Sequence, residues 1–130
     1  MRIDHIAIYT EDLERLRHFY ITYFHGVSNQ GYHNEKTGLR TYFLTFESGA
    51  RLELMTRPRL MPKDHKAASD YLTGYTHLAF SVGSRDEVDS LTDRLKRDGY
   101  TVVSRPRVTG DGYYESGILD PDGNYIEITA

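Results

Sequence analysis

Hydrophobic and polar residues alternate along several short stretches of the chain, and two longer stretches show helical spacing instead. Residues 2–9 and 75–83 alternate and are rich in aliphatic side chains, which is typical of half-buried strands. Each is followed by an apolar stripe at helical spacing, formed by Leu13, Leu16, Tyr20, Tyr23 and Phe24 and then by Val88, Leu91 and Leu95. The remaining alternating stretches predict strands at 27–34, 39–47, 50–57, 100–108, 113–120 and 124–129.

Residues at the ends of the two helical stretches predict where each helix begins and stops. Thr10 is expected to cap the first helix and Gly26 to end it. Ser84, with an acidic residue three positions later, forms a capping-box pattern at the start of the second helix, and Gly99 is expected to stop it.

The two halves of the chain repeat each other. The segment HIAI that begins at His5 recurs as HLAF at His77, and LEL around Glu53 recurs as IEI around Glu127. The spacing from histidine to glutamate is 48 residues in the first half and 50 in the second. The repeat predicts an α+β fold of two tandem βαβββ modules, residues 1–57 and 75–130, joined by a connector at 58–74.

The repeated histidines and glutamates are predicted to share one face of their sheets. Residues of equal parity in a strand point to the same side, so His and Glu lie opposite the aliphatic positions that can pack on the helices. A single histidine on a strand is usually structural, but a duplicated His/Glu pair favours a joint role. Two imidazoles and two carboxylates suit a divalent ion such as Zn²⁺, Ni²⁺, Co²⁺ or Fe²⁺, with positions left open for substrate oxygens. The predicted metal ligands are His5, Glu53, His77 and Glu127.

Composition narrows the classes of function. The 130 residues make about one domain, and the absence of cysteine excludes thiolate metal sites and a cysteine nucleophile. A net charge of −3 without a basic block argues against nucleic-acid binding. No apolar run approaches the roughly 18 residues of a membrane span, and the N-terminal residues do not form the apolar core of a signal peptide. We therefore expect a cytoplasmic protein that acts on a small molecule.

The duplicated βαβββ unit, the four His and Glu residues, and the turn Asp120-Pro121-Asp122-Gly123 before Glu127 resemble the vicinal oxygen chelate superfamily. Within that superfamily, which includes glyoxalase, bleomycin resistance and dioxygenase proteins, the chain is most similar to the glyoxalase I branch. The resemblance covers essentially the whole chain. It implies curled mixed sheets around a metal cleft and one divalent metal per site. It also implies an enediolate-type intermediate in an isomerase or lyase reaction, and a homodimer. In relatives, the glutamate on the last strand serves as the base. Glu127 occupies that position here, and Glu53 is the alternative base.

Two positions depart from the glyoxalase I pattern. Bacterial glyoxalase I enzymes carry an arginine four residues after the first histidine and an asparagine four residues after the first glutamate, and both hold glutathione. Here Tyr9 and Arg57 occupy those positions, so we expect glutathione hemithioacetals to be poor substrates. Parity places Arg51 and Met55 on the cavity face with Tyr9, and either Tyr113 or Tyr114 is expected to close the pocket. The predicted substrate contacts are Tyr9, Arg51, Met55, Arg57 and Tyr113.

Other members of the superfamily supply the alternatives. Two other enzyme classes remain as alternatives: an epimerase that acts on an acyl thioester, and a thiol transferase that opens an antibiotic epoxide. Epoxide-opening members generally lack a ligand at the position of Glu53. Extradiol dioxygenases are generally longer and hold iron in one module. A drug-binding protein of the bleomycin-resistance type would lack the metal ligands that are all present here.

Overall fold

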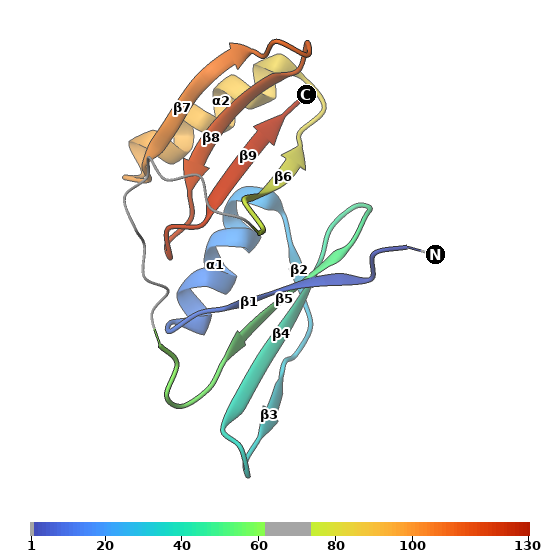
Figure 1. The fold of residues 1–130 in the computed structure, drawn as a ribbon, viewed down its shortest axis with the longest axis vertical. Helices are drawn as coiled ribbons and strands as arrows, with labels where there is room; N and C mark the ends of the chain where they lie inside the picture. The colour runs from blue at the N-terminus through green and yellow to red at the C-terminus, as the bar shows by residue number, and fades with distance from the viewer. Residues whose placement is uncertain (1, 62–73) are drawn as a thin grey trace. The chain divides into compact units, whose positions relative to one another are not determined.

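The chain folds as two compact units, residues 1–66 and 67–130. The computed structural model describes residues 2–61 and 74–130, which are drawn as ribbon in Figure 1. Most of the connector predicted at 58–74 therefore lies outside the described residues.

The first unit contains one helix and a mixed sheet. Its elements are β1 (His5–Tyr9), α1 (Leu13–Phe24), β2 (Val27–Ser28), β3 (Tyr32–Asn34), β4 (Leu39–Thr45) and β5 (Arg51–Thr56). The sheet has the order β1-β5-β4-β2, and β3 also pairs with β4. Strand β1 runs parallel to β5, while the pairs that β4 makes are antiparallel.

The second unit repeats this plan. Its elements are β6 (His77–Ser81), α2 (Arg85–Arg97), β7 (Val102–Val108), β8 (Tyr114–Leu119) and β9 (Tyr125–Thr129). The sheet order is β6-β9-β8-β7, with β6 parallel to β9 and the other neighbours antiparallel. The predicted α+β class is confirmed, and both units follow a βαβββ-like order, with one predicted strand of the first unit divided in two.

The stretch 27–34 does not form the single strand that its pattern predicted. It is divided into β2 and β3 by a turn around Asn29, whose side-chain oxygen accepts hydrogen bonds from the backbone N–H groups of Gly31, at 3.1 Å, and Phe43, at 3.0 Å. Gly31 has φ of 84°, a left-handed conformation that glycine adopts without steric cost. The asparagine thus replaces ladder hydrogen bonds locally, and the strand is interrupted.

The ends of α1 also differ from prediction. Asp12 is the N-cap, because its carboxylate accepts a 3.0 Å hydrogen bond from the Arg15 N–H, while the Thr10 hydroxyl accepts one from the Asp12 N–H. At the other end His25, not Gly26, takes the left-handed cap conformation, with φ of 56°. In the second unit Ser84 caps α2 as predicted, and Gly99 follows that helix with φ of 93°.

The helices cover the aliphatic faces of the two sheets. Helix α1 packs on β5 and β2, and helix α2 packs on β8, β7 and β9 (Figure 1). The predicted stripe of α1 is buried, together with Phe19, which the periodicity missed. In α2 the predicted Leu91 is only half-buried, and Thr92 is buried instead, with its hydroxyl 2.6 Å from that of Ser116 on β8. The helix of each unit therefore leaves the opposite face of its sheet uncovered, and this is the face on which the histidine and the glutamate lie.

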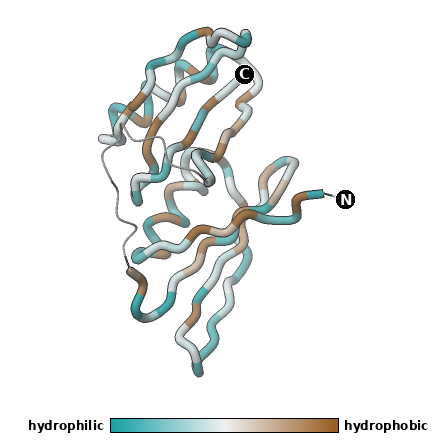
Figure 2. Tube along the Cα trace, viewed as in Figure 1, coloured by the Kyte–Doolittle hydropathy of each residue, from teal (hydrophilic) through white to brown (hydrophobic). Residues whose placement is uncertain are grey.

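Hydrophobic positions continue to the edge strand of the first unit, where β1 appears as a brown stretch in Figure 2. Ile6 on this strand keeps 36% of its surface exposed, whereas Leu52 and Leu54 on the adjacent β5 are buried. Neither helix of the described residues is long and apolar enough to cross a membrane.

The N-cap of α1 gives a direct test of the local account. Asp12→Ala removes the acceptor for the Arg15 N–H and is expected to lower the free energy of unfolding by about 1 kcal/mol. Glu11→Ala, an adjacent exposed carboxylate outside the cap hydrogen bond, is the matched control. Urea denaturation measures both variants, and equal stability of the two would contradict the assignment of Asp12 as the cap.

Candidate metal centre

In the first unit, the pairing of β1 with β5 brings His5 beside Glu53. Ala7 lies directly opposite Glu53 in this parallel pair, and His5 is two residues earlier on the same face. The His5 Nε2 atom lies 3.7 Å from the Glu53 Oε2 atom. The Glu53 side chain is 16% exposed and that of His5 is 41% exposed, so the carboxylate is held in the sheet and the imidazole is accessible.

The second unit contains the same arrangement. Ala79 lies opposite Glu127 in the parallel pairing of β6 with β9, and His77 precedes Ala79 by two residues. The His77 Nε2 atom is 3.5 Å from the Glu127 Oε2 atom, and the side chains are 40% and 19% exposed. The structure therefore brings together two of the four predicted ligands in each unit, with matching atoms facing each other.

The other ring nitrogen of each histidine is held by the residue before it. The His5 Nδ1 atom lies 3.0 Å from a carboxylate oxygen of Asp4, and the His77 Nδ1 atom lies 3.0 Å from the hydroxyl oxygen of Thr76. Metal-binding histidines commonly have such a contact on the nitrogen that does not bind the metal. In both units Nε2 is the ring nitrogen that faces the carboxylate.

The donor set fits a divalent ion. Nitrogen and oxygen ligands lie about 2.1 Å from such an ion, so two of them on one ion cannot be separated by more than about 4.2 Å. Both His–Glu distances, 3.7 and 3.5 Å, meet this condition. Across residues 2–61 and 74–130, no group of three or more His, Cys, Asp or Glu side chains is arranged to hold a metal. Each pair alone therefore supplies only two ligands, fewer than a metal site needs.

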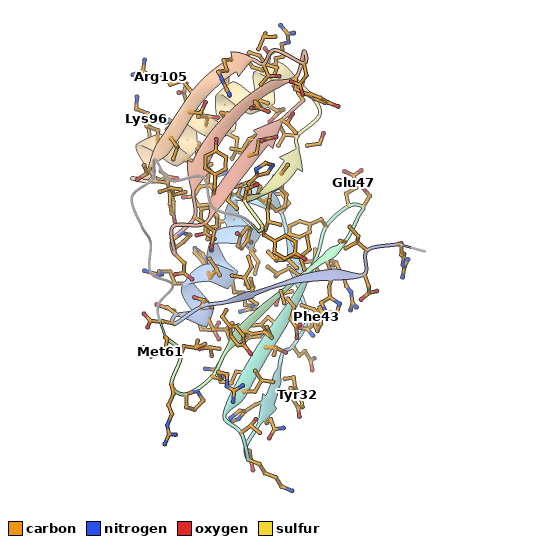
Figure 3. All side chains as sticks on the ribbon, viewed as in Figure 1. Tyr32, Phe43, Glu47, Met61, Lys96 and Arg105 are labelled. Carbon is orange, nitrogen blue, oxygen red and sulfur yellow. The ribbon has the colours of Figure 1, made fainter. Side chains whose placement is uncertain are left out.

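An aromatic ring and an ion pair surround the first His–Glu pair. Phe43 on β4, labelled in Figure 3, pairs directly with Glu53, and its ring meets that of His5 edge-on at 5.4 Å. The Arg51 guanidinium lies 4.5 Å above the same ring and forms an ion pair with Asp4. The hydrogen bond with His5, followed by the interaction with Arg51, lowers the pKa of Asp4 to about 2. Asp4 is therefore ionised at neutral pH.

Different groups surround the second pair. Glu115 on β8 contacts Glu127 and forms a 3.2 Å ion pair with Arg107 on β7. Burial raises the pKa of Glu127, and the negative charge of Glu115 raises it further, against the opposing effect of His77. Burial also raises the pKa of Tyr125, with Glu127 as the next cause. The second unit thus holds its glutamate in an environment that favours proton uptake.

Tyr125 depends on the absence of a side chain at Gly117. Gly117 pairs with Glu127, and a Cβ atom built on it would lie 1.9 Å from the Tyr125 hydroxyl oxygen and 2.4 Å from the ring carbon that bears it. The equivalent position in the first unit is Phe43, which pairs with Glu53. The phenol ring therefore occupies in the second unit the space above the strand that an aromatic side chain fills in the first.

The predicted substrate contacts lie in several environments. Tyr9 is 48% exposed on β1, opposite Met55 on β5, and Arg51 is engaged with Asp4 as described. Arg57 is exposed and follows the last residue of β5. Tyr113 is 58% exposed in the second unit, where its N–H donates to the Thr109 hydroxyl oxygen at 3.0 Å.

Sequence reasoning missed several neighbours of the histidines and glutamates. Asp4 and Thr76 precede their strands, where strand parity does not apply, and Phe43 required the pairing of β4 with β5. Glu115 was missed as well, although the hydrogen-bonded turn from Asp120 to Gly123, which joins β8 to β9, is a signal from which its position opposite Thr129 could have been found.

Comparison with known proteins places these features in a family. Residues 2–128 match the family described as the Glyoxalase/Bleomycin resistance protein/Dioxygenase superfamily. The chain is 30% identical, over 97% of its length and 96% of the relative, to the uncharacterized protein YqjT of Bacillus subtilis (strain 168).

Solved structures of similar fold include enzymes. The glyoxalase I of Leishmania major, described as trypanothione-dependent, aligns with a TM-score of 0.76 and 22% identity over 99% of this chain and 86% of that one. The lactoylglutathione lyase of Agrobacterium tumefaciens aligns with a TM-score of 0.67 and 22% identity over 98% of this chain and 91% of that one. At these identities the likeness shows the fold.

The contact between Gly117 and Tyr125 can be tested by substitution. Gly117→Ala forces the phenol ring to move and is expected to lower the free energy of unfolding by about 1–3 kcal/mol. Tyr125→Leu removes the clashing hydroxyl group. In that background, Gly117→Ala is expected to cost less stability than it costs in the wild-type protein. Urea denaturation measures this cycle, and strictly additive effects would contradict the contact.

Proposed function

The chain belongs to the Glyoxalase/Bleomycin resistance protein/Dioxygenase superfamily, and we propose that it is a metal-dependent isomerase or lyase of the glyoxalase I-like type. Its substrate would be a small molecule with oxygens on adjacent carbons. The observation that carries this proposal is the repeated His–Glu pair, in which Nε2 faces the carboxylate and Nδ1 is held by the preceding residue. The recurrence of this arrangement in both units supports a shared role for the two pairs.

His5, Glu53, His77 and Glu127 would together hold one divalent ion, with zinc, nickel, cobalt and iron as the candidates. Each pair has too few ligands alone, so the proposal requires the two half-sites to meet, either within one chain or between two chains of a homodimer. Sheet topology is compatible with this, because β1 and β6 are the outer members of their sheet orders. Each histidine therefore lies at an edge, with its glutamate one strand further in.

A divalent ion held by these residues would polarise the two substrate oxygens and would make the adjacent C–H group more acidic. Glu127 would accept the carbon-bound proton and return it to the neighbouring carbon. A base works best when its pKa lies near the working pH, and burial together with Glu115 moves the pKa of Glu127 in that direction. Glu53, beside the Phe43 ring, would act mainly as a ligand.

Substrate choice would depend on the side chains around the two pairs. Tyr9 and Met55 lie opposite each other on adjacent strands two positions beyond Ala7 and Glu53, so both could form a wall of the pocket. Arg51, Arg57 and Tyr113 are the further proposed contacts. Because Tyr9 and Arg57 stand where glyoxalase I relatives carry arginine and asparagine, we propose that the preferred substrate is not a glutathione hemithioacetal.

Metal binding is the first test of this function. Wild-type protein is expected to bind about one Zn²⁺ or Ni²⁺ per chain. His5→Ala and His77→Ala should each weaken binding by more than about 100-fold, the upper end of the range for losing an outer-shell partner. His18→Ala, an exposed histidine on α1, is the control and should bind as wild type does. Isothermal titration with a competing chelator measures the affinities, and equal binding by all four proteins would refute the site.

The assignment of the base is tested separately. With metal occupancy matched, Glu127→Gln keeps an oxygen ligand but loses the proton acceptor, and kcat is expected to fall by about 10²–10⁴-fold. Glu53→Gln should lose less. The assay follows metal-dependent deuterium incorporation from D₂O into a panel of α-hydroxycarbonyl compounds, with and without thiol adducts, by NMR. If the two variants are impaired in the opposite order, Glu53 is the base.

A further inference from the structure

The two histidines differ in the chemistry that holds their Nδ1 atoms. Asp4 presents a carboxylate oxygen at 3.0 Å to His5, and Thr76 presents a hydroxyl oxygen at 3.0 Å to His77. Both contacting residues lie immediately before the strand that carries the histidine, so the backbone position is equivalent in the two units. The difference therefore resides in the side chains.

A carboxylate and a hydroxyl group select histidine tautomers differently. An ionised carboxylate only accepts hydrogen bonds, so a neutral His5 ring satisfies it by carrying its proton on Nδ1, which leaves the Nε2 lone pair free. A hydroxyl group both donates and accepts, so Thr76 is compatible with either tautomer of His77. The tautomer of His5 is therefore restricted by its neighbour, whereas that of His77 is not.

Asp4 is itself held in place by the first unit. The Arg51 guanidinium forms an ion pair with the same Asp4 oxygen that faces His5, and it lies 4.5 Å above the Phe43 ring. Phe43 in turn contacts the edge of the His5 ring at 5.4 Å. These four side chains form a closed set of contacts in which the orientation of each depends on its neighbours.

We propose that Asp4, held by Arg51, is a positioning residue that fixes His5 in the Nδ1–H tautomer with Nε2 directed toward Glu53. The proposal rests on the function proposed above, because it assigns the Nε2 lone pair to the metal. The tautomer of His5 is then set before an ion binds, whereas the hydroxyl group of Thr76 leaves the tautomer of His77 open. Loss of an outer-shell carboxylate typically weakens metal affinity by about 10–100-fold.

The tautomer is measured on metal-free protein, so that the result does not depend on metal binding. Long-range ¹H–¹⁵N correlation spectra at pH 8, assigned with the His5→Ala variant, are expected to show protonated Nδ1 in His5. In Asp4→Ala the proton should move partly or wholly to Nε2. Asp4→Asn, which keeps an oxygen acceptor, should give an intermediate result. An Nε2–H tautomer in wild type, or spectra unchanged in Asp4→Ala, would overturn the proposal.

Zinc affinity supplies the second readout. Asp4→Ala is expected to bind Zn²⁺ about 10–100-fold more weakly than wild type, and Thr76→Val is expected to lose less. Asp93→Asn removes one negative charge from an exposed position on α2 and should bind as wild type does. Equal affinity of Asp4→Ala and wild type would overturn the positioning role. Absence of zinc binding by wild type would refute the proposed function instead, and the tautomer would still decide the role of Asp4.

Discussion

The parallel pairing of each histidine strand with a glutamate strand is the constraint on which the site depends. In both units an alanine lies directly opposite the glutamate, and the histidine is two residues before that alanine on the same face. The residues on either side of each glutamate are buried under a helix, which restrains the strand on its other face. Helix packing and register together therefore set the distance between the imidazole and the carboxylate.

The two units share this frame but differ in what surrounds it. In the first unit Asp4, Arg51 and Phe43 hold the imidazole through charge and ring contacts. In the second unit the buried carboxylate has Glu115 as a neighbour, and Gly117 leaves space for the Tyr125 ring. A duplicated scaffold can in this way give equivalent positions unequal roles. The first unit restrains its imidazole, and the second unit holds a carboxylate whose pKa is raised by burial and by Glu115.

Strand periodicity and the internal repeat were sufficient to predict the α+β class, the order of elements and the faces on which His and Glu lie. These patterns did not predict the ends of elements at which a polar side chain forms hydrogen bonds with the backbone. Asn29 interrupts a strand in this way, and Asp12 rather than Thr10 caps α1. Contacts made before a strand begins, such as that of Asp4, are also invisible to parity. Phe43 could be found only from the pairing of β4 with β5, because no tight turn fixes that register from the sequence.

Two half-sites, each with one imidazole and one carboxylate, are proposed to combine on a single ion. X-ray absorption by the zinc-loaded protein can decide this, because multiple scattering from imidazole rings reports how many histidines bind each ion. We expect two imidazole ligands per zinc, with oxygen atoms as the remaining ligands. A spectrum with a single imidazole per zinc would mean that the half-sites bind ions separately, and it would refute the shared site.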